Sequence, residues 1–266
     1  MSNEILANEI PQDEELSPPD PAQSPAATGT HAELNENKAL ALLKQADLAS
    51  EVIEQLAKNA GLLKSRKVKI ALVSHPRAPR HISIPLARHF YTFDLMKVTL
   101  SAHTPADVKV AVDNVLIARL KTLTTGERLT LARRASGRVA AALLLAGKTS
   151  GPRVVKGKMK VASSLAQETR VMRTALENPR LTEALVIDSV LHADAGAALV
   201  QAVAHHEKWS RRREIRVALM RSEHLSLARA LEFSGEIPTD RLRELLASSR
   251  LPDTMKSQLL RDRDKQ

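Results

Sequence analysis

Cysteine is absent from this chain of 266 residues, and aromatic residues make up only 2% of it, as one Trp, one Tyr and three Phe. The lack of cysteine excludes disulfides, thiolate metal ligands and a cysteine nucleophile. Leu, Ala and Val supply most of the apolar content, which is 43%. Because Leu and Ala favour helices, whereas strands favour β-branched and aromatic residues, the composition predicts an all-α fold.

Long hydrophobic runs are also missing. The longest unbroken apolar run is eight residues, at 139–146, whereas a membrane-spanning helix needs about 20. The first fifteen residues, MSNEILANEIPQDEE, have neither the basic start nor the apolar centre of a signal peptide. We therefore expect a soluble, cytoplasmic protein with no membrane span.

Lys and Arg are absent from 1–37, which hold eight acids and five prolines. Such a segment buries too little apolar area to offset the entropy of ordering, so a disordered acidic tail is predicted. Residues 38–266 hold 40 basic and 22 acidic residues. A basic body with an acidic tail is typical of proteins whose partners are polyanions or acidic surfaces. Improved solubility alone is the alternative interpretation.

One nonapeptide, TALENPRLT at 174–182, is echoed elsewhere in the chain. The related segments are ALVSHPRAP at 71–79, ALMRSEHLS at 218–226 and LLASSRLP at 245–252. Each ends an apolar helical stripe with a polar or Pro-containing turn, and a new helix is expected directly afterwards. Repeats of this kind bury their apolar faces only by stacking, which predicts a helical solenoid over 38–266.

Apolar residues at helical spacing predict the individual helices. The expected helices include 39–61, 66–76, 82–91, 93–102 and 107–123. Pro85 is expected near the start of its helix or at a kink. Thr125 is the expected N-cap of a helix beginning at Glu127. Residues 147–160 interrupt the pattern with three Gly, one Pro and five basic residues, which predicts a flexible basic loop.

The turns ALENPRLT and ALVSHPRAP resemble those of bacterial HEAT-like repeats, particularly the leucine-rich-repeat-variant type, in which Asn-Pro turns recur between short helices. The resemblance covers about residues 65–255. It implies a right-handed superhelical solenoid of HEAT-like hairpins and a scaffold, without implying a reaction. The 43-residue interval from Ala175 to Ala218 is interpreted as one hairpin, and the 27-residue interval from Ala218 to Leu245 as a tighter one.

Two groups of basic residues are the candidate binding sites. Arginine suits bidentate phosphate or carboxylate contacts, and a neighbouring tryptophan can stack on a base or sugar. If the turns align on one edge of a solenoid, the second group forms a basic ridge together with the loop. The first group is Trp209, Arg211, Arg212, Arg213 and Arg216. The second is Arg133, Arg134, Arg138, Lys148, Arg153, Lys156, Lys158 and Lys160. Both have a simpler interpretation, as a solvated helix end or a solvated charged face.

Catalytic and metal motifs are not predicted. ALLLAGKT at 142–149 matches the loosest phosphate-binding loop, but its middle continues an apolar helix and no strand precedes it. The nine histidines lack ligand spacing, and no nucleophile elbow is present. We therefore expect no catalytic residue, metal or cofactor.

Two functions remain open at this point. The first is a non-enzymatic scaffold that binds a protein partner or an acidic assembly through an extended basic surface. The second is a nucleic-acid-binding solenoid that contacts phosphates through its Arg and Lys clusters. HEAT-like DNA glycosylases have an architecture similar to the second, but they use a cleft with several aromatics, and this chain has few. The oligomeric state is not predicted.

Overall fold

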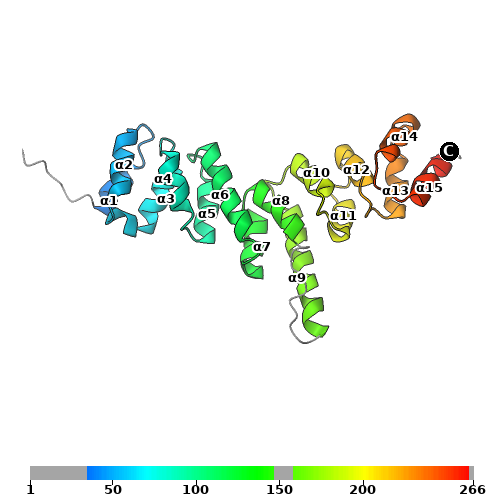
Figure 1. The fold of residues 1–266 in the computed structure, drawn as a ribbon, viewed down its shortest axis with the longest axis horizontal. Coiled ribbons are helices and arrows are strands. Elements are labelled where there is room, and N and C mark those ends of the chain that lie inside the picture. Colours follow the sequence, from blue (N-terminus) through cyan, green and yellow to red (C-terminus); the bar gives the residue numbers. More distant parts are fainter. Residues whose placement is uncertain (1–34, 147–157, 264–266) are drawn as a thin grey trace, which may run out of the picture. The chain divides into compact units, whose positions relative to one another are not determined.

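The computed structural model describes residues 35–146 and 158–263, the side chains of 158–164 excepted. These residues form fifteen α-helices and one short 3-10 helix, and no strand occurs among them. The first eight helices are α1 (Glu36–Leu42), α2 (Ser50–Lys58), α3 (Arg66–Ser74), α4 (Arg80–Ala87), α5 (Thr92–Leu100), α6 (Ala106–Arg119), α7 (Thr125–Arg134) and α8 (Gly137–Ala146), with the 3-10 helix η1 (Leu62–Lys64) before α3. The others are α9 (Lys158–Leu176), α10 (Glu183–Leu191), α11 (Ala197–Ala204), α12 (Arg213–Met220), α13 (Leu227–Ser234), α14 (Thr239–Ala247) and α15 (Asp253–Arg263) (Figure 1). The predicted all-α class is confirmed for the described part of the chain.

Several predicted boundaries change. The helices expected over 66–76, 93–102 and 107–123 are confirmed as α3, α5 and α6, each two to four residues shorter at its C-terminal end. The N-cap of α7 is Thr124 and not Thr125, because the Thr124 hydroxyl accepts a bond from the Glu127 amide while the Glu127 carboxylate accepts one from the Thr124 amide. This reciprocal pair satisfies two amides at the helix start and lowers the pKa of Glu127.

The helix expected over 39–61 is wrong, since the chain breaks between α1 and α2. Residues of a later turn stabilise the break. The Nε2–H of His75 donates to the Gln45 carbonyl at 2.9 Å, and Arg77 donates to the Asp47 carbonyl at 3.1 Å. The other ring nitrogen of His75 accepts a bond from the Arg77 amide at 3.1 Å, which assigns the proton to Nε2.

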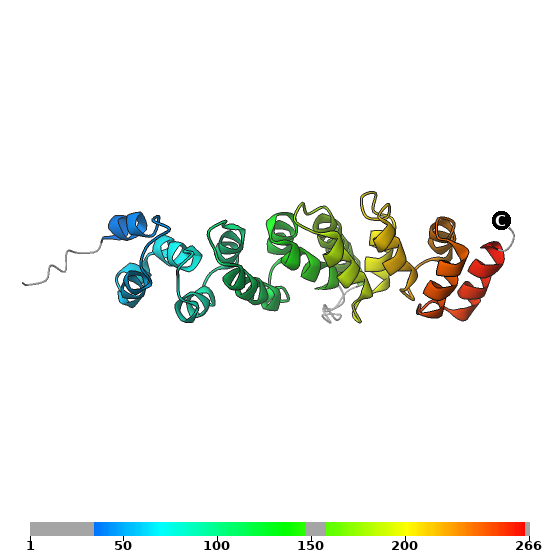
Figure 2. The same cartoon turned by 90° about the horizontal axis from the view of Figure 1, so that it is seen from above.

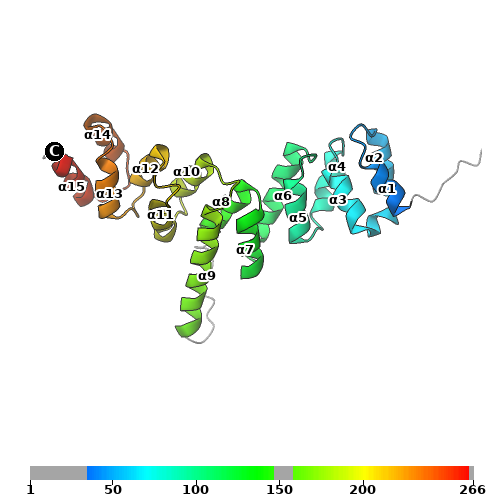
Figure 3. The ribbon, with the colours of Figure 1, turned by 180° about the vertical axis from the view of Figure 1, so that it is seen from behind.

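Helices pack most closely against their next or next-but-one neighbours along the chain. Examples are α5 with α6, α7 with α9, α10 with α12 and α13 with α15. Figure 2 shows this succession from above, and Figure 3 shows α7 beside α9. One apolar core runs from Val73 to Leu259 and a second lies under α1 to α3, with the half-buried Leu86 packed against both. Each helix is therefore buried by near neighbours in sequence, as in stacked repeats.

A polar residue at the helix C-terminus recurs at the turns. Its side chain accepts a hydrogen bond from the amide two residues later, as His75 does, which caps the helix end with a tight turn. The same bond is made by Asn178 (2.8 Å), His192 (3.1 Å), His206 (3.2 Å) and Ser222 (3.4 Å). A buried apolar residue follows three positions after each. The last four positions are 14 or 16 residues apart, so one helix and its turn form the unit.

The interpretation of 43 residues as one hairpin is therefore wrong. Between Ala175 in α9 and Ala218 in α12 lie two complete helices, α10 and α11, so the interval spans three helix-and-turn units. The 27-residue interval from Ala218 to Leu245 spans two. The similar turn sequences that follow α9 and α12 are therefore separated by three helices with their turns, and not by the two helices of one hairpin.

Two domain boundaries also change. Residues 36 and 37, assigned to the tail, begin α1, and residues 158–160, assigned to the basic loop, form the first turn of α9. The remainder of both predicted segments, 1–34 and 147–157, lies outside the described residues. Within the described residues, no helix combines the length and the apolar character needed to cross a membrane.

Candidate functional site

Trp209 belongs to the core and not to a surface. It is 2% exposed, and its indole N–H donates to the Leu176 carbonyl at 2.8 Å, at the C-terminal end of α9. Lys208 lies over the ring, 4.1 Å from its centre. The predicted stacking role of Trp209 is wrong, because no ligand can reach a ring buried in this way. Tryptophan instead satisfies a helix-end carbonyl and fills the core beside the end of α9.

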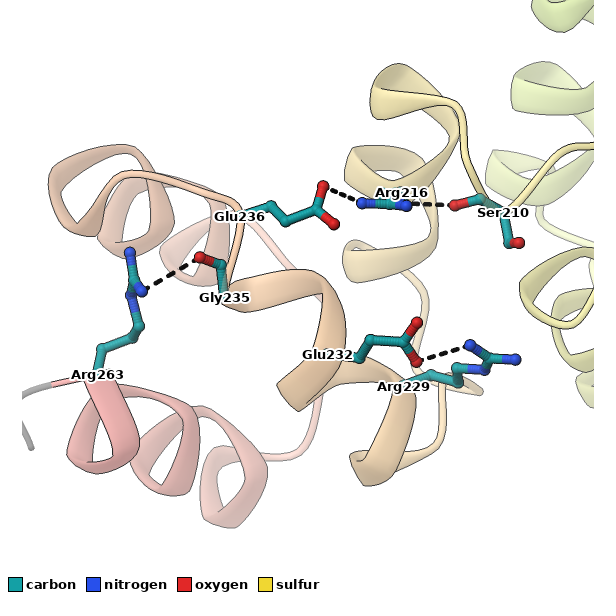
Figure 4. A network of polar contacts seen from close by, with 7 residues as sticks. All are labelled: Ser210, Arg216, Arg229, Glu232, Gly235, Glu236 and Arg263. Carbon is teal, nitrogen blue, oxygen red and sulfur yellow. Dashed lines mark hydrogen bonds and ion pairs between the residues drawn. The ribbon is translucent and has the colours of Figure 1, made fainter. Parts of the chain in front are cut away.

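The side chain of Arg216 also makes contacts within the fold. Its Nε donates to the Ser210 carbonyl at 2.6 Å, and its terminal nitrogen pairs with Glu236 (Figure 4). The guanidinium also lies 5.4 Å from the centre of the Phe233 ring. Its side chain is 17% exposed. These contacts join α12 to the turn after α13, so Arg216 has a structural role, and its guanidinium is less available to a partner than those of Arg211 to Arg213.

The remaining arginines of the first group lie on the surface around the start of α12. Arg211 pairs with Glu207 at 3.3 Å, and Arg212 pairs with Glu183 at 3.4 Å. Arg213 is exposed and has no hydrogen bond or ion pair with any described residue. Exposed pairs of this kind are worth only about 0.2–1 kcal/mol, so Arg211 and Arg212 are readily available to another carboxylate.

The second group also contains both exposed residues and residues with contacts in the fold. Arg133 and Arg134 at the end of α7 are exposed, and their guanidinium groups make no contact with a described polar side chain. Arg138 donates to Asn114 at 3.2 Å and lies near the buried carboxylate of Asp113. Lys158 and Lys160 lie on the first turn of α9. Lys148, Arg153 and Lys156 lie outside the described residues.

Contacts between turns bring the exposed members of the two groups together. Asn178 is 1% exposed and donates to the carbonyls of Ala132 (2.7 Å) and Ala135 (3.2 Å), so the turn after α9 packs on the turn after α7. A side chain at Gly137 would overlap the Arg180 carbonyl, which shows how closely the two turns approach. Arg180 also donates to the Arg134 carbonyl at 3.3 Å.

The turn after α11 continues this series, through the bond of Trp209 to Leu176 and the Arg212–Glu183 pair. Three alternate turns, after α7, α9 and α11, therefore present exposed arginines. We call this set the arginine edge. Its members are Arg133, Arg134, Arg180, Arg211, Arg212 and Arg213. Exposed acids, including Glu177, Glu207 and Glu214, lie among them.

The carboxyl group of Asp113 is 4% exposed, and burial raises its pKa above the ordinary value, although a hydrogen bond from Ser136 and the charge of Arg138 act in the opposite direction. The folded state then binds more protons than the unfolded state between pH 3.8 and the raised pKa, so stability falls as pH rises through that window. We expect Asp113→Asn to raise the free energy of unfolding at pH 7 and to change it little at pH 3.5.

Urea unfolding followed by far-UV circular dichroism at both pH values tests this expectation. Asp188→Asn, at an exposed position of α10, is the matched control and should leave the free energy of unfolding unchanged at both pH values. An equal gain for Asp113→Asn at both pH values would contradict the burial argument.

No family model matches this chain, and neither a curated protein nor a solved structure matches it. Function must therefore be argued from the residues themselves. The turn-forming hydrogen bonds of Asn178, His192 and His206 were not predicted from the sequence, although one signal was present. Each is a polar residue that ends an apolar helical stripe and is followed three positions later by an apolar residue.

Proposed function

We propose that this protein is a non-enzymatic helical-repeat scaffold of the solenoid type that binds an acidic surface of a protein partner through the arginine edge. The observation that carries the proposal is the placement of Arg133, Arg134 and Arg213. They come from turns about 80 residues apart in sequence, the intervening turn links them, and none has a polar partner among the described residues. Neighbour-to-neighbour packing of the helices supports the repeat architecture.

The mixture of charges along this edge favours a protein over a nucleic acid. Proteins that track a phosphate backbone present grooves of one charge sign with aromatic side chains for stacking. Here exposed glutamates lie among the arginines, and the one tryptophan is buried. Complementary charges of both signs are typical of protein interfaces, where they set specificity and association rate.

Fluorescence anisotropy across a salt series tests the proposal, with a labelled 20-residue polyglutamate peptide and a labelled 20-bp DNA duplex as probes. The triple variant Arg133→Gln, Arg134→Gln, Arg213→Gln removes three unpaired charges without breaking a described contact. We expect it to weaken polyglutamate binding about tenfold at low salt, since each exposed pair is worth about 0.2–1 kcal/mol.

The matched control is Lys58→Gln, Lys64→Gln, Lys67→Gln, which removes three exposed, unpaired charges from α2 to α3. The affinity of this control for polyglutamate should stay within about twofold of that of the unmodified protein. Equal losses in the two variants, or no binding by unmodified protein, would overturn the proposal. Tighter binding of the duplex, with a salt slope of about −0.9 per phosphate contact, would replace it with nucleic-acid binding.

A further inference from the structure

Three turns on the other side of the helices meet around Arg221. These turns follow α10, α12 and α14, and are distinct from those of the arginine edge. The Arg250 amide donates to the Arg221 carbonyl at 3.1 Å, and the Gln201 side chain donates to the His224 carbonyl at 2.8 Å. Both of these hydrogen bonds end on backbone carbonyls, so the contacts between the turns do not occupy the guanidinium groups of Arg221 and Arg250.

Two hollows adjoin there. One of about 560 Å³ lies between α12 and α14, and one of about 270 Å³ lies among the three turns. Arg221 and Ser248 line both hollows. The larger volume falls within the range of ligand-binding clefts, about 300–1,000 Å³. We refer to the two hollows together as the Arg221 pocket.

Charge in the smaller hollow is unbalanced. Arg221 and Arg250 line it, both exposed, and neither guanidinium has a hydrogen bond or ion pair with a described residue. Elsewhere in this region arginines have carboxylate partners, such as Arg216 with Glu236 and Arg229 with Glu232 (Figure 4). The one acid lining the smaller hollow, Glu223, lies 3.5 Å from His224.

His192 adds a donor to the same hollow. Its Nδ1 accepts a bond from the Asp194 amide at 3.1 Å, so the neutral ring carries its proton on Nε2. The two guanidinium groups and the imidazole Nε2–H are donors that make no hydrogen bond with a described residue, although the Asp194 carboxylate lies 3.7 Å from the other ring nitrogen of His192. An oxyanion is the group that such a set binds.

The larger hollow is different in character. Its walls include Val217, Ile237, Pro238 and Leu245, of which Ile237 and Leu245 are buried. Its charged lining residues include both signs: Asp240 pairs with Arg243, and Arg241 is accompanied by Glu244. This hollow suits an apolar side chain beside the oxyanion site.

We propose that the Arg221 pocket binds a short peptide segment of a partner protein, with an apolar side chain in the larger hollow and an adjacent carboxylate at Arg221 and Arg250. This site is separate from the arginine edge and does not depend on it. The acid gives charge complementarity and the apolar anchor gives burial, which together are how small pockets achieve specificity.

Isothermal titration with synthetic hexapeptides tests this inference on the full chain. The probe is acetyl-Gly-Leu-Glu-Glu-Leu-Gly-amide, and the controls replace both Leu by Ala or both Glu by Gln. We expect each control peptide to bind about tenfold more weakly, because hydrogen bonds to charged groups and burial of a leucine side chain each contribute at least this factor.

The protein variant is Arg221→Gln with Arg250→Gln, which keeps the backbone bond between the two residues. It should lower the affinity for the acidic probe about tenfold, while the triple variant of the arginine edge should leave it unchanged. Equal losses in both variants would show diffuse charge attraction and overturn the proposal. Equal binding of the alanine peptide, or no saturation below about 1 mM, would overturn it as well.

Discussion

Asn178→Ala is expected to destabilise the protein by about 3 kcal/mol, because it leaves buried backbone groups without partners at about 1–3 kcal/mol each. The amide of Asn178 donates to two carbonyls at the end of α7 and its oxygen accepts from the Arg180 amide. At 1% exposure, water cannot replace these bonds. Urea unfolding followed by circular dichroism measures the loss.

Residue exchange provides the control. His75 makes the same pair of bonds one hundred residues earlier, donating to Gln45 and accepting from Arg77. Asn178→His and His75→Asn should therefore retain more stability than the two alanine variants. If the exchanged variants are no more stable than the alanine variants, the hydrogen bonds are not the reason why these positions are polar.

Glu168→Gln is expected to cost about 3 kcal/mol, the lower end for breaking a buried ion pair. Glu168 of α9 receives two hydrogen bonds from Arg128 of α7, at 2.7 and 2.9 Å, and both side chains are 12% exposed. Loss of the carboxylate leaves the guanidinium desolvated and unpaired. Thermal and urea unfolding should both show the loss.

The double variant Arg128→Met, Glu168→Leu distinguishes pairing from packing. Replacing both charges with apolar residues of similar size removes the desolvation penalty, so the double variant should be more stable than Glu168→Gln. If the stability changes of Arg128→Met and Glu168→Leu, measured separately, add up to that of the double variant, the two residues are not coupled.

Helices whose apolar stripe is continuous could be predicted because the signal is local. α3, α5 and α6 follow directly from apolar spacing within 66–76, 93–102 and 107–123. The break after α1 could not be predicted in this way. Its apolar spacing continues through the turn, and the bonds that hold the turn come from His75 and Arg77, about 30 residues later.

In the candidate site, too, local features could be predicted from the sequence and contacts between distant residues could not. Exposed arginines at helix ends could be located in the sequence, but their partners could not, since Glu183 precedes Arg212 by 29 residues and Glu236 follows Arg216 by 20. Trp209 was misread because a tryptophan beside arginines has the same sequence pattern whether it is stacked in the core or presented to a ligand. The Arg221 pocket could not be predicted because its walls come from three separate segments of the chain.

The burial of the one tryptophan against the C-terminal end of α9 makes it an intrinsic optical reporter for that part of the chain. Far-UV circular dichroism, in contrast, averages over every helix. Because the helices of this chain pack mainly against near neighbours in sequence, the ends of the chain can melt before its centre. Emission and ellipticity recorded on one sample therefore measure the cooperative length of this chain, and a gap between the two midpoints would give the extent of fraying directly.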